Sequence, residues 1–538
     1  MYNSGEFDYV VIGGGSAGCV LAARLSEDPL VQVALVEAGG GDSSALIQCP
    51  AGLALMAKSR SGVNWRFQTV PQPGLNGRRG YQPRGRVLGG SSSINAMVYI
   101  RGQAADYDRW AAAGNPGWGF DDLLPYFIRS EHNLRLEAPL HGQQGPLSVQ
   151  DQGAPNPVAA RFIEAGQQAG LPLNTDFNGA SQEGVGWYQV THRGGERCSA
   201  AKAYLGPALG RPNLKVITEA HATGIVFDGR RAVAIDYRQG DTSQRLKVRR
   251  ELLLCAGALQ SPQLLMLSGV GPAAHLQQLG IPVLHALPGV GQQLHDHVDV
   301  VQVMDTPGMT DLFGVSARGL WRAFGDLRQW RAQRTGRLRT NFGEAGAFYR
   351  SDAEVDAPDV QLHFVIAKLV DHGRKSVLGH GYSCHVCLLQ PKSRGQLTLA
   401  SADAMAAPLI DPAFLSHPDD LPRLVRSFRR MRSILAQPAL AELGGRELAA
   451  SAGAQSDEQI AEFVRNHADT IYHPVGSCRM GPGEQDVVAA DLRVHGLQGL
   501  RVVDASAMPQ IVSGNTNAPV MAMAEKAADL IKSAARLA

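Results

Sequence analysis

A glycine-rich turn near the start of the sequence has the spacing of a nucleotide-binding motif. The strand-like run 8–12 leads directly into Gly13, Gly15 and Gly18, and a helical pattern follows the last of these glycines. Glu37 ends a second strand-like run. In such strand–turn–helix units the glycines let a pyrophosphate reach the helix N-terminus, and the acid accepts hydrogen bonds from a ribose. The motif predicts a bound dinucleotide in preference to a glycine turn without a ligand.

One histidine near the other end of the sequence lies in a setting suited to proton transfer. His473 stands directly before Pro474, which restricts its backbone to extended conformations, and glycines lie close by. Imidazole exchanges its proton near neutral pH, so His473 is the candidate acid or base, with a structural histidine as the alternative. Most other histidines, such as His275 and His417, are typical of surface residues, and the triplet 295–297 is compatible with a hydrogen-bonded turn.

Two further motifs could contribute to chemistry. The stretch 84–95 is rich in Gly, Ser and Arg, so its backbone amides could surround an anion or a flat ring, although a flexible loop has the same composition. Cys384 and Cys387 have the spacing of half a zinc site. They lie in an alternating strand pattern that directs them to opposite faces, and no second pair accompanies them. We therefore expect no metal.

The order of the strand-like and helical runs around the glycine motif and His473 predicts an α/β fold. The sequence ends, as it begins, with a strand-like run, a loop and a helix, which is typical of a doubly wound sheet whose loops meet at the ligand. Both ends of the sequence are therefore expected to converge on one nucleotide. Runs at 215–218, 225–237 and 246–255 predict a small antiparallel sheet that returns to the main sheet.

Residues 306–467 differ in character and predict a second domain with its own sheet. Long helical or loop stretches such as 320–338 alternate there with strand-like runs at 359–366, 382–390 and 395–400. We expect a discontinuous Rossmann-like domain that binds the cofactor and an α+β domain that binds the substrate. The first comprises residues 1–160, 195–305 and 468–538, and the second comprises residues 161–194 and 306–467.

The composition excludes several classes of protein. The 538 residues are enough to bury large cores, and a formal net charge of +2 leaves no surplus to neutralise nucleic acid or an anionic bilayer. No stretch approaches the ~20 apolar residues that span a membrane. Seven cysteines are a sparse and odd count, which argues against a disulfide framework. The first strand-like run starts near Asp8, so we expect no secretory leader. We expect a cytoplasmic protein, at most peripherally associated with a membrane, that binds no nucleic acid.

Four motifs in the same order make the sequence similar to the glucose-methanol-choline (GMC) oxidoreductase family. They are the glycine motif with Glu37, the stretch 85–95, the stretch 257–271, and His473-Pro474 with Asn517. The similarity extends over nearly the whole sequence. It most resembles the bacterial branch that contains choline dehydrogenases and alcohol dehydrogenases with a non-nicotinamide acceptor.

This resemblance implies FAD, not NAD, as the cofactor. It assigns Gly13, Gly15, Gly18 and Glu37 to the ADP half. The further residues that it places along the cofactor are Gly89, Ser91, Asn95, Met97, Ala222, Asp504, Ala505 and Asn515. Family members with covalent flavin carry a histidine at the position of Ile94, and an aliphatic side chain cannot form that bond. The FAD is therefore expected to be dissociable.

The resemblance also implies oxidation of a primary alcohol to an aldehyde by hydride transfer to flavin N5. His473 would accept the hydroxyl proton while the Asn517 amide donates to the developing alkoxide. Glu344 and Tyr472 are the candidate substrate contacts, and Glu344 could equally be structural. Electrons are expected to pass to a quinone or another non-nicotinamide acceptor.

Three alternatives stay open at the level of the sequence. The protein could be a choline dehydrogenase, which needs a site for a quaternary ammonium group, or an alcohol oxidase that uses oxygen. It could also be a non-catalytic or electron-carrying flavoprotein, although the presence of both His473 and Asn517 counts against a degenerate site. The oligomeric state is not encoded in any motif.

Overall fold

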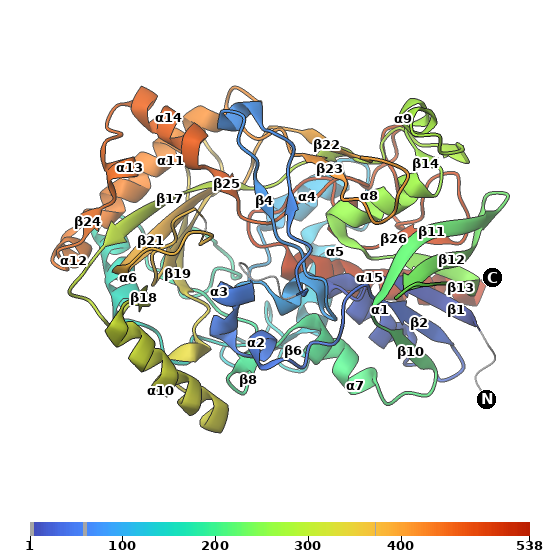
Figure 1. Ribbon diagram of the computed structural model, residues 1–538, viewed down its shortest axis with the longest axis horizontal. Helices are drawn as coiled ribbons and strands as arrows, with labels where there is room; N and C mark the ends of the chain where they lie inside the picture. Colours follow the sequence, from blue (N-terminus) through green and yellow to red (C-terminus); the bar gives the residue numbers. More distant parts are fainter. Residues whose placement is uncertain (1–4, 57–61, 372, 538) are drawn as a thin grey trace.

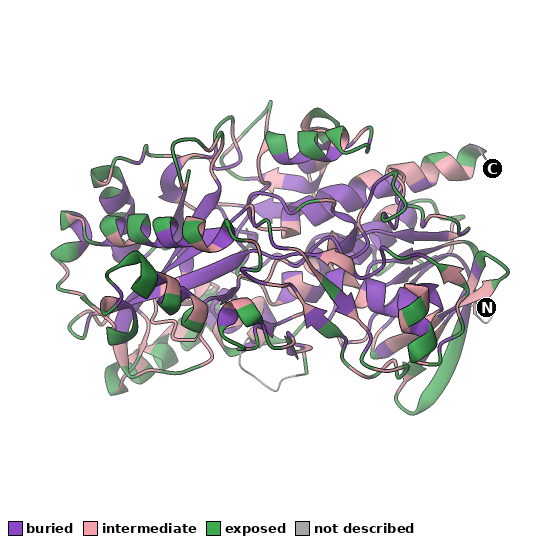
Figure 2. Cartoon of the chain, turned by 90° about the horizontal axis from the view of Figure 1, so that it is seen from above, coloured by how far each residue is buried: buried purple, intermediate pink, exposed green. Residues whose placement is uncertain are grey.

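Two large β-sheets at opposite ends of the molecule organise the chain (Figure 1). The computed structural model describes residues 5–56, 62–371 and 373–537. Each sheet is covered by helices and encloses a hydrophobic core of its own. The central strands of both sheets are largely buried, whereas the outer helices, the loops and the antiparallel edge of the first sheet carry exposed residues (Figure 2). The expected mixed fold with a Rossmann-like part and a sheet-rich second part is confirmed.

The first sheet is parallel at its centre and antiparallel at one edge. Among the described residues it has seven strands, ordered β10-β2-β1-β13-β12-β11, with β26 paired to β13. Their bounds are β1 (Glu6–Ile12), β2 (Val33–Val36), β10 (Leu214–Ile217), β11 (Ala220–Asp228), β12 (Arg231–Gln239), β13 (Thr242–Leu254) and β26 (Leu500–Val502). The expected antiparallel strands therefore extend this sheet directly, because β13 pairs in parallel with β1 and antiparallel with β12. Strand β10 is parallel to β2 instead.

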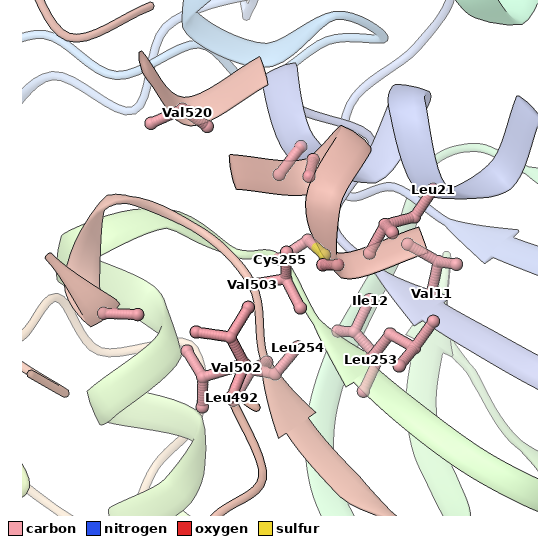
Figure 3. Packing of buried hydrophobic residues seen from close by; sticks show 14 of the residues in the cluster. Val11, Ile12, Leu21, Leu253, Leu254, Cys255, Leu492, Val502, Val503 and Val520 are labelled. Atoms are coloured by element: carbon pink, nitrogen blue, oxygen red, sulfur yellow. The ribbon is translucent and has the colours of Figure 1, made fainter. Parts of the chain in front are cut away.

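Residues from both ends of the chain build the core around this sheet. Strand β2 and the second half of β1, from Tyr9 to Ile12, are continuous buried runs without a charged residue, as expected of parallel strands buried on both faces. Helix α1 (Ser16–Leu25) packs against α15 (Asn517–Leu537), and both helices contribute to the same apolar cluster. Figure 3 shows Val11 of β1, Leu253 of β13 and Val502 of β26 within this cluster. The expected convergence of the two ends is confirmed by these contacts.

The second sheet is antiparallel and has eight strands within the described ranges. They run in the order β24-β17-β21-β20-β19-β7, with β18 and β25 paired at the margins. Their bounds are β7 (Gly184–Trp187), β17 (Val298–Asp305), β18 (Gly314–Val315), β19 (Gly343–Tyr349), β20 (Val360–Val365), β21 (Gly379–Leu388), β24 (Arg446–Glu447) and β25 (Asp469–Thr470). The covering helices are α6 (Pro157–Gln168), α11 (Asp420–Leu435) and α14 (Asp457–His467).

The division into two domains stays a prediction, but two strands pair with partners other than the predicted boundaries imply. Strand β17, expected in the first domain, pairs with β21 of the second sheet. Strand β22 (Gly395–Thr398), expected in the second sheet, instead pairs with β16 (Gln292–Leu294) and β23 (Leu409–Asp411) in a small separate sheet. Local residue type predicts a strand, whereas only tertiary contacts decide its partner.

Helix α8 (Gly257–Leu267) begins earlier than its proline suggests. Proline is common in the first turn of a helix, but Pro262 lies farther inside this one and cannot donate to the carbonyl of Ala258. The hydroxyl of Ser477 donates to that carbonyl oxygen at 2.5 Å. This bond joins α8 to the segment that follows His473. No helix in the described part of the chain is both long and apolar enough to cross a membrane.

Candidate active site

A cavity of about 640 Å³ opens at the carboxyl ends of the central strands of the first sheet. Ile12, Val36 and Cys255, which stand at or just after the ends of β1, β2 and β13, contribute to its wall. The opposite wall comes from the second sheet and includes His363 and His385. This volume lies within the range of small-molecule and cofactor sites. The position also agrees with the rule that ligands bind at strand carboxyl ends in doubly wound sheets.

The glycine motif forms one end of the cavity. Gly13 has φ +99°, and a Cβ there would lie 2.6 Å from the carbonyl oxygen of Cys255, so no larger residue fits. Gly15 lines the cavity, whereas Gly18 packs helix α1 onto the turn. Glu37 lines the same end and accepts hydrogen bonds from the amides of Gly14 and Gly39 at 2.9 and 2.8 Å. Burial raises the pKa of Glu37 to about 7.

The loop 84–97 lies against this motif and forms a second wall. A Cβ on Gly90 would meet Gly15 at 2.7 Å, and the amide of Gly89 donates to the carbonyl of Gly14 at 2.7 Å. Gly89 is therefore a contact between loops and does not itself line the cavity. The predicted cofactor residues that do line it are Gly13, Gly15, Glu37, Ser91, Asn95, Met97, Ala222, Asp504, Ala505 and Asn515.

These features fit a flavin dinucleotide. The end walled by glycine backbone accepts a pyrophosphate beside the N-terminus of α1, where the helix dipole favours an anion. The N-terminus of α15 reaches the same cavity through Asn517. The hydroxyl of Ser16 donates to the Asn517 side-chain oxygen at 2.7 Å, so the first residues of the two helices are joined. The same cavity extends to residues of the second sheet, including His363 and Val365.

His473 is fixed through its backbone as well as its ring. The preceding residue, Tyr472, has φ +75°, a costly conformation for a tyrosine, and lines the cavity as expected. The backbone amide of Tyr472 donates to Thr470, and its carbonyl accepts from the Arg84 guanidinium at 2.6 Å. The backbone amide of His473 donates to a carboxylate oxygen of Asp296 at 2.8 Å. These bonds hold the ring against the cavity.

The hydrogen bonds of the His473 ring define which nitrogen is the base. Nε2 of His297 lies 3.0 Å from the carbonyl of Leu389, which can only accept, so this nitrogen carries the proton. Burial lowers the pKa of His297 to about 3, so its Nδ1 is an acceptor and takes a hydrogen bond from Nδ1 of His473 at 3.1 Å. Nε2 of neutral His473 is therefore unprotonated. Burial, assisted by His297, lowers the pKa of His473 well below 6.5.

Asn515, and not Asn517, is the amide beside this base. The Asn515 amide nitrogen lies 3.3 Å from Nε2 of His473, and its oxygen accepts from Gln361 at 3.2 Å, which orients the nitrogen toward the histidine. The predicted pairing of His473 with Asn517 is corrected by this geometry. Asn517 begins helix α15, and its side-chain oxygen is engaged by Ser16.

Family models described as GMC oxidoreductase match residues 7–299 and 391–524. The chain belongs to the GMC oxidoreductase family. The predicted family is thereby confirmed, and FAD is the cofactor expected of this family. The two matched regions include the glycine motif, His473 and Asn515.

Relatives and solved structures match nearly the whole length of this GMC oxidoreductase. The chain is 47% identical over 528 residues to an alcohol dehydrogenase [acceptor] of Pseudomonas putida, covering 98% of this chain and 95% of the relative. It is 45% identical over 538 residues to human mitochondrial choline dehydrogenase, covering 98% and 90%. A crystal structure of pyridoxine 4-oxidase from Mesorbium loti has 33% identity and a TM-score of 0.87, covering 97% of this chain and 98% of that one.

Glu344 does not reach the cavity of this GMC oxidoreductase. Its carboxylate is buried and accepts hydrogen bonds from the Thr340 hydroxyl and the Asn156 amide, both at 2.6 Å. It also does not belong to the residues that line the cavity. The expectation that Glu344 contacts substrate is corrected, and the structural reading of this residue is the one that the geometry supports.

The triplet 295–297 contributes more than the sequence indicated. His295 accepts from the amide of Ile511 at 3.0 Å and so anchors the loop before Asn515. Asp296 holds the backbone of His473, and His297 holds its ring. The sequence offered one signal, two histidines around an acid next to an apolar strand. The contacts themselves join residues that are 176 and 177 positions apart in the sequence, so no local pattern reveals them.

Proposed function

We propose that the protein oxidises a primary alcohol to an aldehyde and passes the electrons to a quinone or another non-nicotinamide acceptor. The observation that carries this proposal is the unprotonated Nε2 of His473 beside the Asn515 amide, in a cavity continuous with the glycine-walled end. The named alcohol dehydrogenase relative agrees with it. When bound, FAD supplies a two-electron acceptor for the hydride that leaves the alcohol carbon.

His473 removes the hydroxyl proton of the substrate. An alcohol releases hydride readily only as negative charge builds on its oxygen, so a base must take the proton during this step. The tautomer fixed by His297 directs a lone pair into the cavity, and the lowered pKa keeps this base neutral at physiological pH. The proton is held at Nε2 once it has been transferred.

The Asn515 amide stabilises the charge on the substrate oxygen. Its nitrogen is a fixed donor because Gln361 holds the amide oxygen, and Gln361 is itself anchored to the Tyr188 hydroxyl at 3.1 Å. Donors that are oriented before the reaction stabilise a developing anion without reorganisation. A non-catalytic flavoprotein has no need of this arrangement.

The lining of the cavity favours an uncharged alcohol over choline. Among the described residues, the carboxylates that line it are Glu37 and Asp504, which both belong to loops of the first sheet. Lys368 and Lys375 line the side formed by the second sheet, and burial keeps His363 and His385 neutral by lowering their pKa values to about 3 and about 4. A quaternary ammonium group requires aromatic faces and negative charge. We therefore place choline second, although several relatives are named choline dehydrogenases.

A panel of substrates and acceptors tests this proposal. We expect purified flavoprotein to oxidise uncharged primary alcohols faster than choline, and to use a quinone or phenazine acceptor far better than oxygen. Added NAD or NADP should support no turnover, because the site is assigned to FAD. Steady-state rates for each pair, with peroxide measured in parallel, give the result. Stoichiometric peroxide at comparable rates would identify an oxidase, and nicotinamide-dependent turnover would refute the proposal.

The flavin is expected to be held without a covalent bond. Ile94 lines the cavity next to Asn95, at the position where attached flavins require a histidine, and its alkyl side chain offers no nucleophile. Acid or heat denaturation should therefore release all the yellow colour into the supernatant. Absorbance at the flavin maximum, measured before and after precipitation, checks this. Colour that stays with the washed precipitate would contradict it.

The cysteines agree with the proposed cytoplasmic location. All seven are buried and free, including Cys384 and Cys387. Cys384 belongs to the main core of the second sheet, whereas Cys387 packs into a separate small cluster, so the strand directs them to opposite faces as predicted. Free thiols in these numbers are typical of a reducing compartment.

A further inference from the structure

Helix α10 (Ala317–Gln333) carries an apolar surface that no part of the described chain covers. Leu320, Trp321 and Phe324 are 69%, 81% and 74% exposed, and Leu327 is 38% exposed. We call these four residues, together with Arg328 and Arg331, the α10 surface. Large apolar side chains grouped on one face of a protein mark an interaction site, whereas single exposed ones are ordinary.

The opposite side of α10 attaches the helix to the protein. Trp330 is buried, and its indole donates to the carbonyl of Gly195 at 2.9 Å. Asp326 pairs with Arg337 at 3.5 Å, and Ser316 caps the N-terminus. The α10 surface has helical spacing and faces away from these attachments. In Figure 1 the helix lies along the outer edge of the molecule, below the second sheet.

Positive charge accompanies the apolar residues. Arg318, Arg328 and Arg331 are exposed and form no ion pair with any described residue. Asp326 is the only acidic residue of the helix and is already engaged. The overall charge of +2 conceals this local excess. A helix with Trp, Phe and Leu exposed next to unpaired arginines has the composition of one that lies in the interface of an anionic bilayer.

The apolar residues continue from α10 to the cavity. Val315, just before the helix, is 42% exposed and lines the cavity. It bridges to Leu378, which is 77% exposed. Lys375, whose side chain is 73% exposed, lines the cavity from the same region. The surface and the cavity opening therefore belong to one face of the protein.

We propose that α10 docks on an anionic phospholipid bilayer, with Leu320, Trp321 and Phe324 among the upper acyl chains and Arg328 and Arg331 on lipid phosphates. Charge favours lipid over a second copy of the chain, because two such helices would bring unpaired arginines of like charge together. Docking turns the cavity opening toward the membrane, so that an apolar alcohol or a lipid-dissolved quinone enters from it. This last consequence rests on the proposed function, whereas the binding itself does not.

Co-sedimentation of the flavin-loaded protein with vesicles tests the docking. We expect binding to vesicles of phosphatidylcholine with phosphatidylglycerol, weaker binding to phosphatidylcholine alone, and loss of binding as salt is raised. Trp321→Ser with Phe324→Ser should lower the partition coefficient at least about tenfold. Arg328→Gln with Arg331→Gln should lower it about fivefold per arginine on anionic vesicles only.

A matched control replaces exposed leucines elsewhere. Leu30→Ser with Leu209→Ser removes side chains that are 85% and 55% exposed and should leave vesicle binding unchanged. All variants should keep parental activity with a soluble acceptor, which shows that they fold. Absence of vesicle binding by the parent, or equal binding by parent and the Trp321/Phe324 variant, would overturn the proposal. A dimer in light scattering that the same variant abolishes would identify a second copy of the chain as the occupant.

Discussion

Replacement of His473 with alanine is expected to slow flavin reduction by alcohol by ~10² to 10⁴ while FAD stays bound. The ring faces the cavity through Nε2, and the alanine variant lacks this base for the hydroxyl proton of the substrate. The proton is removed only as the transition state forms, so the substitution should lower the rate constant of flavin reduction and leave FAD binding unchanged. Anaerobic stopped-flow measurements of flavin bleaching give this rate directly.

The pH dependence of the same measurement follows from the lowered pKa of His473. Its neutral form is the active one and persists above the lowered pKa, so the parental rate should stay level through neutral pH and fall only in acid. His417→Ala, at a histidine with 39% side-chain exposure, serves as the matched control and should reduce at the parental rate. Near-parental reduction in His473→Ala would remove this histidine from the mechanism.

Replacement of Asn515 with alanine should slow reduction about 10-fold to 100-fold, the value of one hydrogen bond to a charged oxygen. Asn517→Ala is the matched control, two positions along the chain. Its side chain faces Ser16 and not His473, so the flavin-loaded variant should reduce close to the parental rate. Loss of the Ser16 bond should appear instead as weaker retention of FAD during gel filtration.

The two asparagine variants distinguish between Asn515, which the structure places beside His473, and Asn517, which the sequence motif suggested. A large loss in Asn517→Ala together with parental reduction in Asn515→Ala would restore the pairing that the sequence suggested. Both variants keep the His473 pH profile in our expectation, because an amide accepts no proton. A shifted profile in Asn515→Ala would mean that the amide sets the pKa of the base in addition to binding the substrate oxygen.

The cofactor end of the site could be predicted because its signals are local. Gly13, Gly15 and Glu37 lie within one strand–turn–helix–strand unit, and backbone sterics restrict position 13 to glycine. The stretch 84–95 and His473 were candidates from their local sequence, and the resemblance to a known family decided between their functional and structural alternatives. Each of these segments lines the cavity.

The remaining site residues depend on contacts that no local pattern contains. Asn515 and Asn517 have the same chemistry, and only the start of helix α15 decides which one faces His473. His297 looked like part of a turn because its partner is 176 residues away. Glu344 was a plausible cation contact by residue type, but Thr340 and Asn156 hold its carboxylate outside the cavity.

The bond between Ser16 and Asn517 bears on how the protein matures. These residues are 501 positions apart, so the ribosome makes one half of the FAD site long before the other. Until α15 emerges, the apolar side of α1 lacks its partner helix and is open to chaperones. Cofactor loading must therefore follow synthesis of almost the entire chain, and shortage of FAD should lead to an accumulation of full-length apoprotein and not of arrested fragments.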